Sequence, residues 1–354
     1  MTGYFRSALR NAIAGAALVA VCGGAQADAV ADFYSGKTVN LLIGSQPGGG
    51  FDIAGRLLAR HIGRYIPGEP NVVPQNMQGA GGLRMANFLA NAADRQGLSI
   101  GMHVRGIIQQ PMLGDPAAKF DPLGLSWIGT MSSFKTDAYF MFVRKERGIA
   151  SVEGMRHASP PVALGSVGGV STNVIFALLS PELFGFKTRL VKGYAGSTGV
   201  MLAVQRRELD GTFIGLSSLG GQDKANLADG TYVPILQLAR VDRHPALPNV
   251  PTAREIVTEP DDRALLAFAE SQFFVALPVS GPPAIPADRT RALREAFMAT
   301  HRDPTFLAEA ERLNVDVSPI GGEEMTKIIA EMAATPPAVI ERYKRVIALA
   351  EDGK

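Results

Sequence analysis

Residues 38–58 read TVNLLIGSQPGGGFDIAGRLL, and the interpretation of the whole chain begins from them. Val39–Ile43 is an apolar run that predicts a β-strand, and the chain then breaks at Pro47 and three successive glycines. Apolar residues return at helical spacing, at Ile53, Leu57, Leu58 and Ile62. The expected order is therefore strand, glycine loop and helix, with the free N–H groups of the helix facing the loop. Such a loop can bind an anion, for example a carboxylate or a phosphate.

Two nucleotide-binding motifs do not fit this loop. A P-loop requires Lys followed by Ser or Thr after its last glycine, whereas Phe51 and Asp52 stand there. The dinucleotide fingerprint requires Gly or Ala at its sixth position, and counting from Gly48 that position is Ile53. For this loop taken by itself, a structural turn without a ligand remains an alternative.

The first 27 residues have the pattern of a secretory signal peptide. Arg6 and Arg10 form a basic start, and Ala12–Val21 is a short apolar core. The cleavage site is Ala25–Ala27, so the mature chain is expected to begin at Asp28 and to be exported to the periplasm. A membrane anchor is less favoured because the apolar core is too short to span a bilayer.

Composition limits the functions open to the mature chain. The leader holds two of the 35 basic residues and no acidic residue, which leaves 33 basic and 33 acidic residues. This balance does not indicate binding to nucleic acid or to an anionic membrane surface. The only cysteine is Cys22, in the leader, where lipidation is a less favoured alternative; the mature chain therefore has no disulfide or cysteine metal site. The length of 354 residues and the 46% apolar content predict two domains with ordinary cores.

The combination of strand, glycine loop and helix occurs again in the second half of the chain. Residues 162–164 predict a strand, residues 165–173 form a glycine-rich loop (GSVGGVSTN), and a helical pattern follows. Alternating strands and helices predict parallel sheets, which bind ligands beyond the carboxyl ends of their strands. Two such loops facing each other across a cleft would hold one anion. Arg105 follows the strand expected at 98–102, so it could pair with a carboxylate, and a surface or interdomain salt bridge is its alternative.

The remaining elements are expected from the same patterns. The tail is expected to be helical up to residue 350, with a break near Pro336-Pro337. Further strands are expected at 71–74, 127–132, 138–143, 189–191, 212–214, 233–239 and 272–277.

The order of several short motifs resembles the solute receptors of tripartite tricarboxylate transporters, also called Bug-type receptors. The motifs extend over nearly the whole mature chain: YSGK (34–37), PGGGFD (47–52), GAGG (79–82), WIG (127–129), YAG (194–196), LDG (209–211), VPT (250–252) and RDP (302–304). The resemblance implies an α/β periplasmic binding protein, type II-like. It would have two domains, each a mostly parallel sheet flanked by helices, with a hinged cleft between them. We expect residues 28–133 plus 249–354 in domain 1 and residues 134–248 in domain 2.

The resemblance also implies a function. The protein would capture a small carboxylate-bearing organic anion by domain closure and deliver it to two membrane subunits, as a monomer without cofactor or metal. Main-chain N–H groups of the two glycine loops would hold the carboxylate, and a segment near residue 196 would add contacts. With Arg105, the expected ligand-binding residues are Gly48, Gly49, Gly50, Phe51, Asp52, Ser166, Gly168, Gly169, Val170, Ser171, Thr172, Gly196, Ser197 and Thr198.

Other readings remain open at this stage. Phe51 stands where the family usually has Thr or Ser, which suits a more apolar carboxylate. His103, Tyr194, Ser217 and Ser218 are weaker candidates for the cleft. A receptor that presents its ligand to a sensor kinase would have the same sequence features. An exported hydrolase is less favoured, because the chain contains no His-Glu-x-x-His and no Gly-x-Ser-x-Gly, and we expect no catalytic residues.

Overall fold

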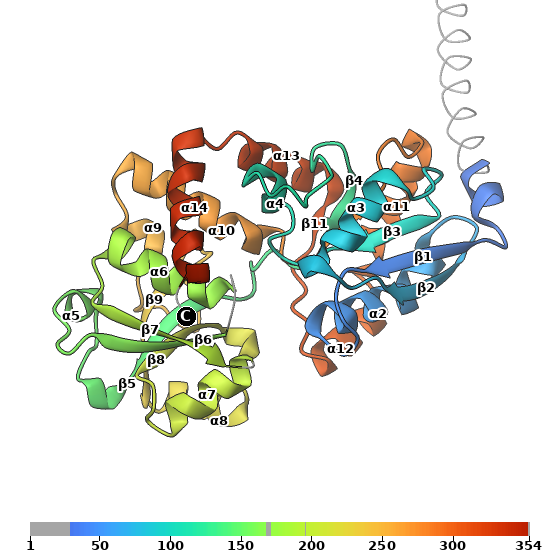
Figure 1. Cartoon of the computed structure of the whole chain (residues 1–354). Coiled ribbons are helices and arrows are strands. Elements are labelled where there is room, and N and C mark those ends of the chain that lie inside the picture. The colour runs from blue at the N-terminus through green and yellow to red at the C-terminus, as the bar shows by residue number, and fades with distance from the viewer. Residues whose placement is uncertain (1–28, 168–170, 195, 353–354) are drawn as a thin grey trace, which may run out of the picture.

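The computed structural model describes residues 29–167, 171–194 and 196–352, which form two sheets flanked by helices (Figure 1). The strand order is β11-β4-β10-β3-β1-β2 in the first sheet and β7-β6-β8-β5-β9 in the second. We call the parts of the chain built on these two sheets lobe 1 and lobe 2. The two lobes lie next to each other, so the edges that carry the loops can share one site.

The first sheet is parallel at one end and antiparallel at the other. Strand β1 pairs in parallel with β2 and β3, whereas β10 runs antiparallel to β3 and β4, and β11 runs antiparallel to β4. These strands are β1 (Thr38–Ile43), β2 (Asn71–Asn76), β3 (Ser99–Met102), β4 (Ser126–Thr130), β10 (Pro278–Gly281) and β11 (Ile320–Gly321).

The second sheet is mixed in the same way. Strand β6 pairs in parallel with β7 and β8, and β5 runs antiparallel to both β8 and β9. These strands are β5 (Tyr139–Arg144), β6 (Val162–Val167), β7 (Thr188–Tyr194), β8 (Gly211–Gly215) and β9 (Tyr232–Leu238). The expected two-sheet α/β fold is confirmed, but the sheets are mixed rather than mostly parallel. The difference arises because β5 and β10, the strands with which the chain enters or re-enters a lobe, run against their neighbours.

Helices cover both sheets. Those of the first half are α2 (Gly50–Ile62), α3 (Leu83–Asn91), α4 (Gln109–Met112), α5 (Val152–Arg156) and α6 (Thr172–Phe184). Those of the second half are α7 (Ser197–Gln205), α8 (Gly221–Ala228), α9 (Ala253–Ile256), α10 (Pro260–Phe274), α11 (Ala287–Thr300), α12 (Pro304–Arg312), α13 (Gly322–Ala333) and α14 (Pro337–Asp352). The helical tail and its break at Pro336-Pro337 are confirmed. In the described part of the chain, no helix has the length and apolar character needed to cross a membrane.

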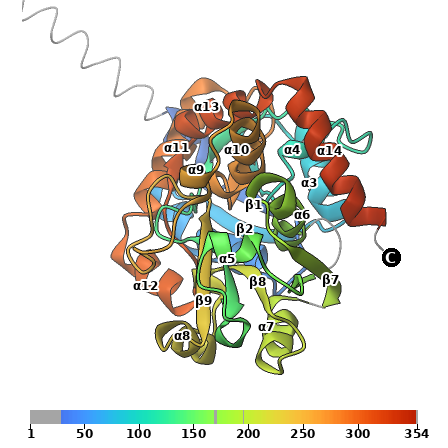
Figure 2. The same ribbon diagram turned by 90° about the vertical axis from the view of Figure 1, so that its left-hand side faces the viewer.

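Alternation along β5 shows how lobe 2 is packed. Tyr139, Met141 and Val143 join a buried cluster with side chains of α6, α10 and α14, whereas Phe140 and Phe142 join a second cluster with side chains of α7. Successive residues of a strand point to opposite faces, so the apolar sequence YFMFV requires helices on both sides. Figure 2, in which lobe 2 faces the viewer, shows α10 and α14 above this sheet and α7 and α8 below it.

The chain crosses between the lobes three times in its described part. It passes from β4 to β5, returns through α10 to β10, and crosses again between α13, which packs on β4, and α14, which packs on α6. The core of lobe 2 thus includes Leu265 and Phe268 of α10 and Tyr343 of α14. The domain limits at residues 133 and 248 stay a prediction.

One expected strand is wrong. Residues 272–274 are the end of helix α10, and the strand begins only at Pro278. The preceding run, LLAFAESQFF (265–274), is rich in residues that favour helices, and a short apolar run does not by itself distinguish a helix from a strand.

Candidate ligand-binding site

The first glycine loop is fastened by its own acidic residue. Gly48 has φ +80°, and its N–H donates to the Asp52 carboxylate at 2.8 Å. Arg56 Nε donates to the same carboxylate at 2.9 Å and Asn76 Nδ2 at 2.8 Å. Burial alone would raise the pKa of Asp52, but the hydrogen bonds from Arg56, Gly48 and Asn76 outweigh it and hold the pKa below its ordinary value. Asp52 is 4% exposed and its carboxylate is already hydrogen-bonded to these three groups, so it holds the loop in position.

A cavity of about 290 Å³ lies between the lobes beside this loop. Gly50 and Phe51 at the start of α2 line it from lobe 1. Lobe 2 contributes the start of β5 and the short turn after β8, including Asp137, Tyr139, Gly215, Ser217 and Ser218. The two walls of the cavity therefore belong to different sheets.

Arg105 also lines this cavity, three residues after β3 ends. Its guanidinium carbon lies 5.0 Å from the ring centres of both Phe134 and Phe273. Its Nε is buried without a hydrogen-bond partner, and no ion pair to Arg105 occurs among the residues that the structure describes. Burial lowers the pKa of Arg105 from its ordinary value, which the negative charges of nearby acidic groups only partly offset. Since that ordinary value is very high, the group remains a cation, stacked on aromatic rings and open to an anion.

Asp137 is the acidic residue of the opposite wall. It is 2% exposed, and it accepts hydrogen bonds from Ala138 N at 2.8 Å, Ser217 N at 3.2 Å and Ser217 Oγ at 2.5 Å. No Lys, Arg or His forms an ion pair with it within the described chain. Burial raises the pKa of Asp137, against the effect of the hydrogen bonds from Ser217 and Ala138.

The second glycine loop is only partly within the described residues. Gly168, Gly169 and Val170 lie outside them. Of its other expected ligand contacts, Ser166 is fully buried, with its hydroxyl 3.5 Å from the Val191 carbonyl, and Ser171 donates to Asn173 at 2.7 Å. The 290 Å³ cavity is not lined by any of Ser166, Ser171, Thr172, Gly196, Ser197 and Thr198. Their roles in ligand binding stay predictions.

The sequence and the structure were compared with those of known proteins. No family model matches the sequence, and no curated protein matches it. A TctC solute binding protein from Polaromonas is similar in structure, at 18% identity and TM-score 0.68, over 89% of this chain and 99% of that one. The fold is that of a two-domain periplasmic binding protein. BugD is similar at 19% identity and TM-score 0.59 (88% and 98% covered), and MatC from Rhodopseudomonas palustris with bound malate at 17% and 0.56 (88% and 99% covered).

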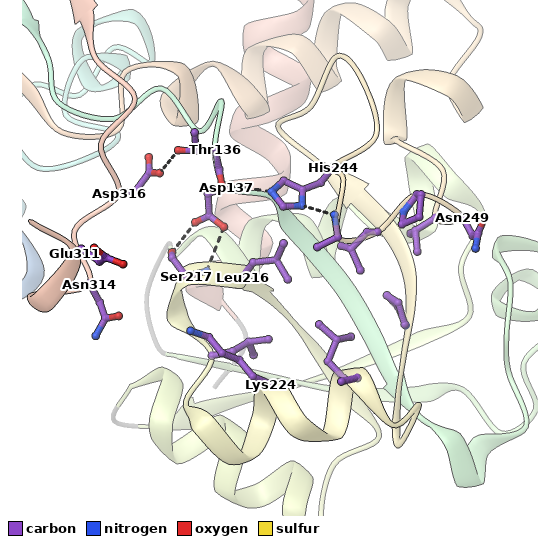
Figure 3. A pocket seen from close by; sticks show the side chains of 18 of the residues that line it. Thr136, Asp137, Leu216, Ser217, Lys224, His244, Asn249, Glu311, Asn314 and Asp316 are labelled. Atoms are coloured by element: carbon purple, nitrogen blue, oxygen red, sulfur yellow. Dashed lines mark hydrogen bonds between the residues drawn. The ribbon is translucent and has the colours of Figure 1, made fainter. Parts of the chain in front are cut away.

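In this periplasmic binding protein fold, a larger cavity of about 780 Å³ lies beside the first one (Figure 3). Both are lined by Asp137, Ser217 and residues 314–316. Figure 3 shows Asp316 bonded to Thr136, at 2.5 Å, while Lys224 lies on the other side of the space. Asp316 also accepts from the hydroxyls of Ser132 and Ser318, so it fastens the first crossing segment to lobe 1.

The structure therefore brings together Gly50, Phe51 and Arg105 of the expected site residues, and Ser217 and Ser218 of the weaker candidates. His103 instead has a fully buried ring that bonds Ser280 at 2.7 Å. No group of His, Cys, Asp and Glu that could hold a metal occurs in the described ranges.

Sequence reasoning missed Asp137. The rule that parallel sheets bind ligands beyond the carboxyl ends of their strands does not select Asp137, because Asp137 precedes a strand. Because β5 is antiparallel to β8, with Tyr139 opposite Gly215, the start of β5 lies at the same sheet edge as the end of β8. A lone acidic residue before the apolar run 138–143 was the available signal.

Proposed function

We propose that this chain is a periplasmic solute receptor of the tripartite tricarboxylate type, which binds a small organic anion in the cavity between its lobes. The observation that supports this most directly is the Arg105 guanidinium, which lines that cavity without a hydrogen-bonding or ionic partner in the described residues. The bound malate of MatC, which is similar in fold, is a ligand of the expected class.

The chemistry of Arg105 favours a carboxylate as the bound group. A buried cation that forms no direct ion pair is unfavourable, and a ligand that supplies such a pair reduces that cost. A carboxylate matches the planar fork of a guanidinium and can accept two parallel hydrogen bonds. The rings of Phe134 and Phe273 fix the plane of the guanidinium before the ligand arrives, so little side-chain freedom is lost on binding.

Binding would be coupled to closure of the lobes. A solute that touches Gly50 and Arg105 on one wall and Ser217 on the other binds a closed form better than an open one, so it shifts the population toward closure. In this proposal the loops at Ser166–Thr172 and Gly196–Thr198 reach the solute as the lobes approach. The loaded receptor, exported and cleaved after Ala27, then acts as a monomer that delivers the solute to two membrane subunits.

The test is the variant Arg105→Gln in the mature chain, studied by isothermal titration calorimetry with malate, succinate and glutarate. We expect wild-type protein to bind at least one of these acids and the variant to bind it roughly 10- to 100-fold more weakly, because a hydrogen bond to a charged group contributes about 1.5–3 kcal/mol. The matched control is Arg60→Gln, which removes a surface arginine paired with Glu309 at 2.7 Å and should leave affinity unchanged. Wild-type affinity in Arg105→Gln, or no binding of any carboxylate by the wild type, would refute the proposal.

A further inference from the structure

The charges around the cavity do not balance for a simple carboxylate. The Asp, Glu, Lys and Arg side chains among its described lining residues are Arg105, Asp137 and Asp316, which are one cation and two anions when all three are ionised, and burial raises the pKa of Asp137. A ligand that carried only carboxylates would add further negative charge to a space that already has an excess of it. A ligand that also carries a cation would compensate that excess.

The two carboxylates differ in how they are held. Asp316 is occupied by the hydroxyls of three residues that join the crossing segment to lobe 1, namely Ser132, Thr136 and Ser318. Asp137 is more deeply buried, and within the described residues its carboxylate accepts only from Ala138 and Ser217, on its own lobe, while its main-chain carbonyl accepts from Arg240 at 3.2 Å. One carboxylate oxygen, Oδ2, accepts a single hydrogen bond from the described residues, from Ser217 Oγ, and therefore retains a free lone pair.

Arg105 and Asp137 come from different lobes, because Arg105 follows β3 of lobe 1 and Asp137 precedes β5 of lobe 2, although the Arg105 guanidinium reaches the Phe134 and Phe273 rings of the lobe 2 cluster. Each is a charged group without an ionic partner in the described part of the protein. Aromatic rings of Phe51, Phe134 and Tyr139 line the same space, and such faces attract a desolvated cation. A cavity lined by one cation and one anion that form no ion pair with each other matches a molecule with both charges.

We propose that the solute is a small zwitterion, whose carboxylate pairs with Arg105 while its ammonium group pairs with Asp137 across the space between the lobes. This inference rests on the proposed function and specifies the class of its solute. It makes Asp137 the residue that selects amine-bearing acids over simple ones. It also gives closure a direct cause, since one molecule bridges the opposite charges of the two lobes.

The experiment uses matched pairs of acids that differ in one amino group: glutarate with glutamate, butyrate with 4-aminobutyrate, and propionate with 3-aminopropionate. Calorimetric titration of the mature chain should show at least one amine-bearing acid bound about tenfold or more tightly than its partner, a size that charge pairs across an interface reach. The variant Asp137→Asn, which keeps the shape and one acceptor oxygen, should remove that preference. It should leave the affinity for the simple acids unchanged or higher.

The comparison variant is Asp316→Asn, which removes a negative charge of the same cavity from lobe 1 and should lower the ratio of affinities within a pair much less than Asp137→Asn does. Thermal melting without ligand verifies that both variants are folded. Equal or weaker binding of every amine-bearing acid, or an unchanged preference in Asp137→Asn, overturns the inference. An equal loss of preference in Asp316→Asn overturns the assignment to Asp137. If only the simple acids bind, and Arg105→Gln weakens their binding, the zwitterion inference is overturned and the proposed function is not.

Discussion

Replacing Asp52 by alanine tests whether one carboxylate holds the first glycine loop in place. The side chain is 5% exposed and accepts from a main-chain N–H, an arginine and an asparagine amide, at 2.8 to 2.9 Å. Removing it leaves the Gly48 N–H without an acceptor and takes from the Asn76 amide one of its two acceptors, the other being the Ser45 carbonyl at 3.1 Å, while Arg56, at 40% exposed, can turn to water. Breaking a buried charged pair costs about 3–5 kcal/mol, so with Arg56 partly solvated we expect about 3 kcal/mol.

Differential scanning calorimetry of the mature chain measures this loss. For a protein of this size, 3 kcal/mol corresponds to a fall in Tm of roughly 4–5 °C. The folded-state pKa of Asp52 lies below its unfolded value, so its stabilisation is present above the unfolded pKa and disappears as the pH falls through the folded one. The gap in Tm between wild type and Asp52→Ala should therefore narrow below about pH 4.

The matched control is Glu153→Ala. Glu153 also binds an arginine and a second side chain on its own helix, at 3.1 Å from Arg156 and 2.7 Å from His157, but it is 64% exposed. Its removal should change the Tm little, because solvent-exposed ion pairs contribute little. If the Tm of Asp52→Ala is as close to the wild-type Tm as that of Glu153→Ala, Asp52 does not hold the first glycine loop in place.

Two glycine substitutions separate binding from folding. Gly49→Val should lower the free energy of unfolding by only about 1 kcal/mol, as a poorer helix cap, because a Cβ there meets nothing nearer than the Gln46 carbonyl at 3.7 Å. The same variant should abolish carboxylate binding in calorimetry. Normal binding would contradict the role of the first glycine loop. Gly211→Ala should lower the free energy of unfolding by more than about 2 kcal/mol, since its Cβ would lie 2.0 Å from the Phe142 carbonyl oxygen of the paired strand. A Tm within roughly 2 °C of the wild-type value would contradict this destabilisation.

Local patterns in the sequence were enough for the individual strands and helices and for one wall of the site, while the two-sheet architecture was implied by the family resemblance. The apolar run before Gly44, the glycines at 48–50 and the helical spacing after them together predict β1, the loop and α2, because each pattern acts over a few residues. Arg105 was found because the end of β3 is fixed by its own sequence and the ligand edge of a parallel sheet follows from topology.

The remaining features of the fold and of the site depend on contacts between segments that are distant in the sequence. Nothing near residues 137–144 shows that β5 runs against β8, and that direction alone brings Asp137 to the ligand edge. The helical state of residues 272–274 likewise follows from the packing of α10 between α6, α13 and α14, which lie far from it in sequence. The role of Asp52 was also hidden, because its partner Asn76 is 24 residues away and only the pairing of β1 with β2 brings the two together.

The triple crossing of the chain restricts how the lobes can move. Two connections leave the lobes more freedom to twist against each other than three do, and the third connection here runs from α13 to α14. In the proposed receptor, this restriction would favour a solute whose length matches the separation of Arg105 and Asp137, since only such a molecule could contact both groups at once.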